Sequence, residues 1–147
     1  MSELPSDRRA LTVACDGASR GNPGPAGIGV QITDEDGSVV AEIAEGLGET
    51  TNNVAEYTAV IEGLARAAEL GGTDVLVRSD SQLLVNQLSG RYRVKTAHLV
   101  PLHEQVRAQA RRFERIRFEH VPRERNREAD RLANEGVDAW LAARRRR

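Results

Sequence analysis

The chain has 147 residues, of which 39% are hydrophobic and 29% are charged, and its formal net charge is −1. That length is sufficient for one domain with a substantial core and too short for two domains of ordinary size. No apolar run approaches the roughly 18 residues of a membrane span, and residues 1–7 lack the features of a signal peptide, so we expect a cytoplasmic protein with no membrane partner. Cys15 is the only cysteine, which excludes an internal disulfide and a thiolate metal cluster.

The charge is unevenly distributed along the chain. Residues 1–77 contain 13 acidic and 4 basic residues, whereas residues 78–147 contain 9 acidic and 17 basic residues. A basic half is typical of proteins that bind nucleic acid or another phosphate-rich partner. Solvated helix faces with interspersed Glu and Arg would explain the same asymmetry, so charge alone does not decide between the two interpretations.

The first half of the chain predicts an antiparallel meander followed by a long helix. Apolar and polar residues alternate in three stretches, as in half-buried strands. Apolar residues then recur at helical spacing until Gly71 and Gly72 end the pattern. The expected elements are strands at residues 11–15, 27–32 and 38–44, a turn at 34–37, a polar connection at 46–53, and a helix that carries Tyr57 and Ala68.

The second half predicts two more strands and three more helices. A helical crossover leads into the fourth strand, so that strand should run parallel to its neighbour. The expected elements are strands at residues 73–79 and 116–121, helices at 81–88, 99–110 and 126–142, and a basic linker at 91–96. The order βββαβααβα predicts an α/β fold in which helices flank a five-stranded mixed sheet, with three antiparallel strands and then parallel strands. We expect one domain over residues 1–143 and a basic C-terminal tail over residues 144–147.

Four acidic residues lie at the junctions of these expected elements. Each has an ordinary structural explanation as a turn former, a helix cap or a partner of a helix dipole; Glu56, for example, lies at capping-box spacing from Asn53. Together, however, they offer the hard oxygen ligands that Mg²⁺ takes from separate rigid elements, and two such ions can clamp a phosphoryl displacement. The four are Asp16 at the end of the first strand, Glu56 in the first turn of the long helix, Asp80 after the fourth strand and Asp130 early in the last helix.

Four motifs that contain these acids resemble those of the type 1 ribonuclease H family. They are DGASRGNPGPAG at residues 16–27, TTNNVAE at 50–56, SDSQ at 79–82 and NREADRLA at 126–133. The resemblance covers nearly the whole chain in the correct order. It implies an RNase H-like fold, with Asp16 on the central strand, and makes residues 1–143 a single RNase H domain.

The resemblance also implies a metal site. Asp16, Glu56, Asp80 and Asp130 match the family's metal-binding carboxylates, which would hold two Mg²⁺ ions, or Mn²⁺ ions, in each active site. Asp16 would bridge both ions, Glu56 and Asp80 would complete one ion site, and Asp130 would complete the other.

Further residues match positions that contact the nucleic acid in the family. Gly17, Asn22, Asn52 and Asn53 match positions at the minor groove of an RNA/DNA hybrid, where backbone groups and short amides read 2′-hydroxyls. Thr51 matches a position that holds a phosphate of the DNA strand. Helix capping by Asn52 and Asn53, and a plain connection between strands at the Gly- and Pro-rich loop, are the alternative interpretations.

The chain departs from the family pattern before its last acid. Many members carry a histidine in a loop there, but His120 lies ten residues before Asp130 and ends the fifth expected strand, so we interpret it as a strand residue. Arg123 in the shortened loop is the better substitute, because it could bind the scissile phosphate or assist the leaving group, although it could not shuttle a proton. A solvated loop arginine is the alternative.

The chain also lacks the long basic handle with which some members grip the hybrid. Only the linker at residues 91–96 stands at that place, and its Tyr92 could meet the DNA backbone or simply be exposed. We expect weaker hybrid binding than in relatives with a handle. Trp140 lies at helical spacing from Val137 and is expected in the core rather than in base stacking.

The sequence therefore predicts an endoribonuclease that hydrolyses the RNA strand of RNA/DNA hybrids and leaves 3′-hydroxyl and 5′-phosphate ends. One metal ion would activate a water and the other would stabilise the leaving 3′-oxygen. The alternatives are a related nuclease acting on double-stranded RNA and a hybrid-binding module without catalysis. A phosphate-binding scaffold with incidental acids is a more distant one. We expect a monomer with no obligate protein partner.

Overall fold

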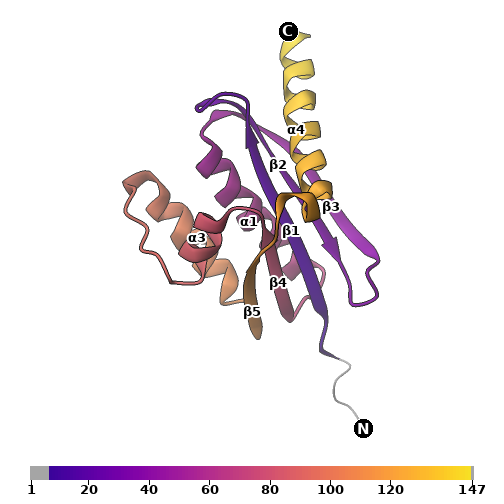
Figure 1. Ribbon diagram of the computed structural model, residues 1–147. Helices are drawn as coiled ribbons and strands as arrows, with labels where there is room; N and C mark the ends of the chain where they lie inside the picture. Colours follow the sequence, from indigo (N-terminus) through magenta and orange to yellow (C-terminus); the bar gives the residue numbers. More distant parts are fainter. Residues whose placement is uncertain (1–6, 147) are drawn as a thin grey trace.

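A five-stranded mixed sheet forms the centre of the protein (Figure 1). The computed structural model describes residues 7–146. The strands are β1 (Ala10–Ser19), β2 (Gly24–Thr33), β3 (Val39–Thr50), β4 (Asp74–Ser79) and β5 (Arg115–His120). The helices are α1 (Asn52–Glu69), α2 (Gln82–Leu88), α3 (Val100–Ala110) and α4 (Arg127–Arg145), with short 3-10 turns η2 (Ala97–Leu99) and η3 (Arg123–Arg125).

The strand order is β3-β2-β1-β4-β5, with β1 at the centre. β1 and β2 pair antiparallel, as do β2 and β3, whereas β4 runs parallel to both β1 and β5. The predicted fold class, with three antiparallel strands followed by parallel strands, is therefore confirmed.

Helices α1 and α4 cover opposite faces of the sheet, as β2 makes clear. Val30 of β2 faces Gly63 of α1, whereas the neighbouring Gly29 faces the backbone of α4 at Ala129 and Ala133. Side chains alternate between the two faces of a strand, so α1 and α4 must lie on different sides (Figure 1). The largest fully buried side chains lie mainly between α1 and the sheet, among them Tyr57, Leu64, Val13, Ile28 and Ile32.

The approach of α4 depends on glycines in β2. A Cβ on Gly29 would overlap the carbonyl oxygen of Ala129, and a Cβ on Gly27 would lie 2.7 Å from the carbonyl oxygen of Ala133. The backbone of α4 therefore rests almost directly on β2. Asp130 lies in the first turn of this helix, so the contact between α4 and β2 also fixes the distance of Asp130 from the sheet.

Two strands are longer than the sequence predicts. β1 continues through Asp16 to Ser19, so Asp16 lies within the strand rather than at its end. β3 continues to Thr50, so most of the polar connection predicted for residues 46–53 is strand. The reason is pairing, because the ladder between β2 and β3 reaches Gly24 opposite Thr50 although glycines 46 and 48 have low strand propensity.

The cap of α1 also differs from the prediction. Thr51 is the N-cap and its side-chain oxygen accepts a hydrogen bond from the Val54 amide at 3.2 Å. Asn53 therefore does not cap the helix, and Glu56 lies in the second turn, not the first. Likewise Ser81, rather than Asp80, caps α2. Helix capping therefore does not explain the presence of Glu56 or of Asp80.

Helix α4 continues beyond residue 142 to Arg145, and its last turns extend past the sheet (Figure 1). Arg144 lies over the Trp140 ring at 5.2 Å and pairs with Glu49 at 3.3 Å, and Trp140 itself packs against Gly46. Part of the predicted tail is therefore helical. Arg147 and residues 1–6 lie outside the described residues. Residues 1–6 are most of the segment from which the absence of a signal peptide is predicted. Across residues 7–146, no helix has the length and apolarity required to cross a membrane.

Gly29→Ala is expected to destabilise the protein by about 1–3 kcal/mol, because the added methyl group must displace α4 from β2. Urea unfolding would measure the change. Gly37→Asn is the control, since Gly37 has a φ of 82° in an open turn where asparagine is tolerated and space is free. Equal free energies of unfolding for the two variants would contradict the close approach of α4.

Candidate active site

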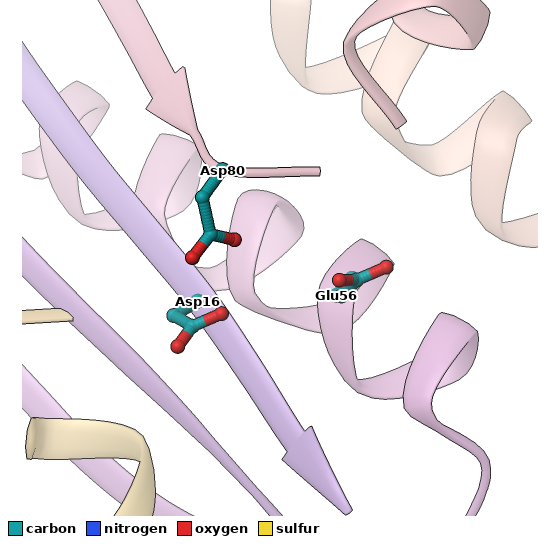
Figure 2. Close-up of side chains that lie close together, drawn as sticks. All are labelled: Asp16, Glu56 and Asp80. Carbon is teal, nitrogen blue, oxygen red and sulfur yellow. The ribbon is translucent and has the colours of Figure 1, made fainter. Parts of the chain in front are cut away.

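Three of the four predicted acids converge beside the C-terminal half of the central strand β1 (Figure 2). Asp16 comes from β1, Glu56 from α1 and Asp80 from the residue directly after β4. One carboxylate oxygen of each lies within 4.8 Å of the others. Side chains from three separate elements therefore point toward a common point.

The local sequence explains why the three acids meet. The parallel ladder between β1 and β4 ends at Ala14 opposite Arg78, so the chain leaving β4 passes beside Asp16. Gly17 allows α1 to approach, because a Cβ there would overlap the backbone between Ala55 and Glu56. Without a glycine next to Asp16, Glu56 could not come so close.

The fourth acid, Asp130, lies beside Asp16 but outside the group of three. It is half-buried, and it contributes to raising the pKa of Asp16 both through a side-chain hydrogen bond and through its charge. Asn126, at the start of α4, places the helix: its side-chain amide donates to the carbonyl oxygen of Cys15 at 2.9 Å, one residue before Asp16. This hydrogen bond joins the start of α4 to β1 directly beside Asp16.

The cluster carries strongly perturbed carboxyl groups. Burial, followed by the charge of Asp80 and by contact with Asp130, raises the pKa of Asp16 to about 8. Burial and the charge of Asp80 raise the pKa of Glu56 to about 7. Burial also raises the pKa of Asp80, against the opposing charges of Arg123 and His120. These carboxylates are therefore costly to ionise together unless a cation joins them.

The acids line a cleft of about 450 Å³. Its walls come from β1 and the turn that follows it, from the start of α1, from the residue after β4, from η3 and from the first turns of α4. The lining residues are Asp16, Gly17, Ala18, Ser19, Arg20, Asn52, Glu56, Asp80, Arg123, Asp130 and Asn134.

Comparisons with known proteins place this geometry in a family. A family model described as Reverse transcriptase-like matches residues 14–136. Ribonuclease HI of Halobacterium salinarum is 44% identical over 84% of this chain and 62% of its own length. The crystal structure of RNase H1 from that organism has a TM-score of 0.84 and is covered to 98%. The chain belongs to the type 1 ribonuclease H family.

Further proteins are similar over most of this chain. A Mycobacterium tuberculosis protein named a bifunctional protein is 49% identical over 88% of the chain, which spans only 36% of that relative's length. The crystal structure of LC11 RNase H1 in complex with an RNA/DNA hybrid is 43% identical, covers 89% of this chain, is itself covered to 99%, and has a TM-score of 0.85. The family resemblance inferred from the four motifs is thereby confirmed.

The predicted ribonuclease H substrate residues lie around the cleft in different ways. Gly17 and Asn52 line it directly, next to the acids. The side-chain oxygen of Asn22 accepts a hydrogen bond from the backbone amide of Asn52 at 3.1 Å. This bond ties the β1–β2 turn to the start of α1. Thr51 is occupied as a helix cap, and Asn53 is exposed and does not line the cleft. Their contacts with nucleic acid stay predictions.

The two residues considered for the family's histidine position lie near Asp80. His120 ends β5 opposite Ser79, which confirms its interpretation as a strand residue. Arg123 lies in η3 and lines the cleft. The positive charge of each lowers the pKa of Asp80, Arg123 having the larger effect. The cleft thus contains an arginine, as the shortened loop predicts, whereas its role stays a prediction.

Sequence reasoning missed three residues of the site. Asn126 was seen only as a helix start, although its buried amide joins α4 to β1. Asn134 and Arg20 line the cleft and contact each other. The spacing of four residues between Asp130 and Asn134 was a usable signal, because such pairs lie on one face of a helix. No comparable signal identifies Arg20.

Asp16→Asn is expected to stabilise the metal-free protein more at pH 9 than at pH 5. The folded pKa of Asp16, about 8, lies above its ordinary value of 3.8, so the folded state loses stability as rising pH ionises the group. The asparagine variant escapes this loss, and the extra stabilisation at pH 9 should be on the order of 1–3 kcal/mol.

Urea unfolding with a chelator present, at both pH values, measures this difference. Glu62→Gln, which changes an exposed carboxylate of α1, serves as the control and should show no such pH dependence. An Asp16→Asn effect of the same size at pH 5 and pH 9 would show that Asp16 is not held in a repulsive, buried cluster.

Proposed function

We propose that this protein is an endoribonuclease that hydrolyses the RNA strand of RNA/DNA hybrids. The observation that carries the proposal is the convergence of Asp16, Glu56 and Asp80, with Asp130 beside them, in an open cleft of a type 1 ribonuclease H chain. The LC11 relative, crystallised with an RNA/DNA hybrid, supports this class of substrate. The basic second half of the chain agrees with a polyanionic partner.

The donor set fits divalent metal ions. The converging groups are all carboxylates, the hard oxygen ligands of Mg²⁺ and Mn²⁺, and the raised pKa values of Asp16 and Glu56 indicate that these groups ionise together only at a cost, which a bound cation would offset. Asp16, the most buried acid, would be shared by two ions, with Glu56 and Asp80 at one and Asp130 at the other. Bound ions would supply a nucleophile from water and stabilise the leaving 3′-oxygen, so that products carry 3′-hydroxyl and 5′-phosphate ends.

Four further residues in or beside the cleft would orient the hybrid. Gly17 and Asn52 lie beside the acids, where a backbone amide and a short side chain would meet ribose 2′-hydroxyls. Asn22 would support this contact by holding Asn52. Arg123, across the cleft beside Asp80, would bind the phosphate to be cleaved through its planar guanidinium.

Cleavage of one labelled RNA strand, presented in an RNA/DNA hybrid and in an RNA/RNA duplex, tests substrate and reaction together. We expect cleavage of the hybrid only with Mg²⁺ or Mn²⁺, and a cleavage rate at least about 100-fold lower in Asp16→Asn. A labelled DNA/DNA duplex, included as a third substrate, should not be cleaved. Glu62→Gln is again the matched control.

Each alternative gives a different result in that assay. Equal cleavage of RNA/RNA would favour a double-stranded RNA nuclease. Hybrid binding without metal-dependent cleavage would favour a binding module. Full activity of Asp16→Asn in a correctly folded protein would contradict the assignment of the acids.

Arg123→Ala is expected to lower kcat/KM on the hybrid by roughly tenfold or more, because a charge-assisted contact contributes about 1.5–3 kcal/mol. Arg123→Lys should restore part of this loss, since it keeps the charge but not the planar fork. His120→Ala is the comparison, and a larger loss in that variant than in Arg123→Ala would reverse the roles assigned to the two residues.

A further inference from the structure

A line of polar side chains connects the β1–β2 turn to Asp130. Arg20, in the turn, pairs through its guanidinium with Asp138 of α4 at 2.8 Å and donates to the side-chain oxygen of Asn134 at 3.3 Å. The Asn134 amide donates in turn to the backbone carbonyl of Asp130 at 3.0 Å and lies 3.5 Å from its carboxylate. Arg20 and Asn134 both line the cleft.

The donors and acceptors in this line fix the orientation of the Asn134 amide. A guanidinium has only donors, so it requires the oxygen of Asn134 to face Arg20. The NH₂ group must then face Asp130. A flipped amide would place its oxygen against the oxygens of Asp130 and its NH₂ against the guanidinium, and both contacts would be repulsive.

Asp130 needs such a restraint because of its neighbours. It is a half-buried aspartate on the first turn of α4, next to Asp16 and the other acids, and like charges would drive its side chain away from the cluster. An amide donor on the following helical turn offsets this by holding the carboxylate on the side of the cleft. The 3.5 Å contact is long, as is common in catalytic sites without substrate.

We propose that Asn134 is a positioning residue that holds the carboxylate of Asp130 toward Asp16, and that Arg20 fixes the orientation of the Asn134 amide. The inference rests on the proposed function, because it assigns Asp130 to a metal ion. Asn134 acts through Asp130 and need not touch the hybrid. Arg20, held by Asp138 and by a hydrogen bond from its own amide to the Pro25 carbonyl at 2.9 Å, acts one step further out.

Calorimetric titration with Mn²⁺ tests the role of Asn134 without a turnover assay. Asn134→Ala should weaken Mn²⁺ binding by roughly tenfold, which is the usual effect of losing a group that orients a metal ligand. Asn134→Leu, which keeps a similar shape but has neither donor nor acceptor, should weaken Mn²⁺ binding to a similar extent. Hybrid affinity measured in a chelator should stay unchanged in Asn134→Ala. Glu135→Ala, on the exposed side of α4 where it pairs with Arg131, is the control and should bind Mn²⁺ like the wild type.

A double-mutant cycle separates the role of Arg20 from direct nucleic-acid binding. Arg20→Ala should weaken Mn²⁺ binding less than Asn134→Ala does, and it should have no further effect in the Asn134→Ala background, because Arg20 acts through that amide. If Arg20→Ala instead weakens hybrid binding in chelator equally in both backgrounds, Arg20 contacts the nucleic acid and its assigned role is wrong.

The outcomes also distinguish this inference from the proposed function. A wild-type protein that neither binds Mn²⁺ nor cleaves the hybrid would contradict the proposed function itself. A wild-type protein that does both, together with Asn134 variants of unchanged Mn²⁺ affinity, would overturn only the role of Asn134.

Discussion

The mutual repulsion of buried carboxylates is the constraint on which this site depends. Asp16 is only 9% exposed, and this burial raises its pKa. The neighbouring carboxylates of Asp80, Asp130 and Glu56 raise it further. Such a cluster weakens the metal-free protein at neutral and higher pH, because folding brings together charges that water would keep apart. The same cluster is suited to divalent cations, since one carboxylate oxygen each of Asp16, Glu56 and Asp80 already lies within 4.8 Å of the others.

The rest of the fold supplies the packing that holds the acids together. Gly17 lets α1 reach β1, and Gly29 lets α4 rest on β2, so Glu56 and Asp130 approach Asp16 on two helices whose positions are fixed by backbone contact. The parallel pairing of β1 and β4 brings Asp80 to the same place. Asn126 adds a buried hydrogen bond at the junction of α4 and β1. The acids therefore stand on rigid elements, which is what a preorganised metal site requires.

Much of the architecture and the acid cluster could be predicted from the sequence, because element order and motif spacing both depend on local residue patterns. The prediction failed at residues 46–50, where pairing with β2 extends β3 through glycines that locally disfavour a strand. It also missed the contact between Arg20 and Asn134, residues 114 positions apart, which only the packing of α4 against the β1–β2 turn brings together. Thr51 as the cap of α1 was missed because Asn53 offered a plausible capping pattern of its own.

The most direct test of the account is anomalous diffraction from crystals of the protein grown with Mn²⁺ and an RNA/DNA hybrid. The account predicts manganese peaks in contact with the carboxylate of Asp16, with Glu56, Asp80 and Asp130 among the other ligands, and the scissile phosphate of the RNA strand at the same place. The absence of any peak at Asp16, or a hybrid bound away from the cleft, would contradict the claim that this carboxylate cluster is the metal-binding active site.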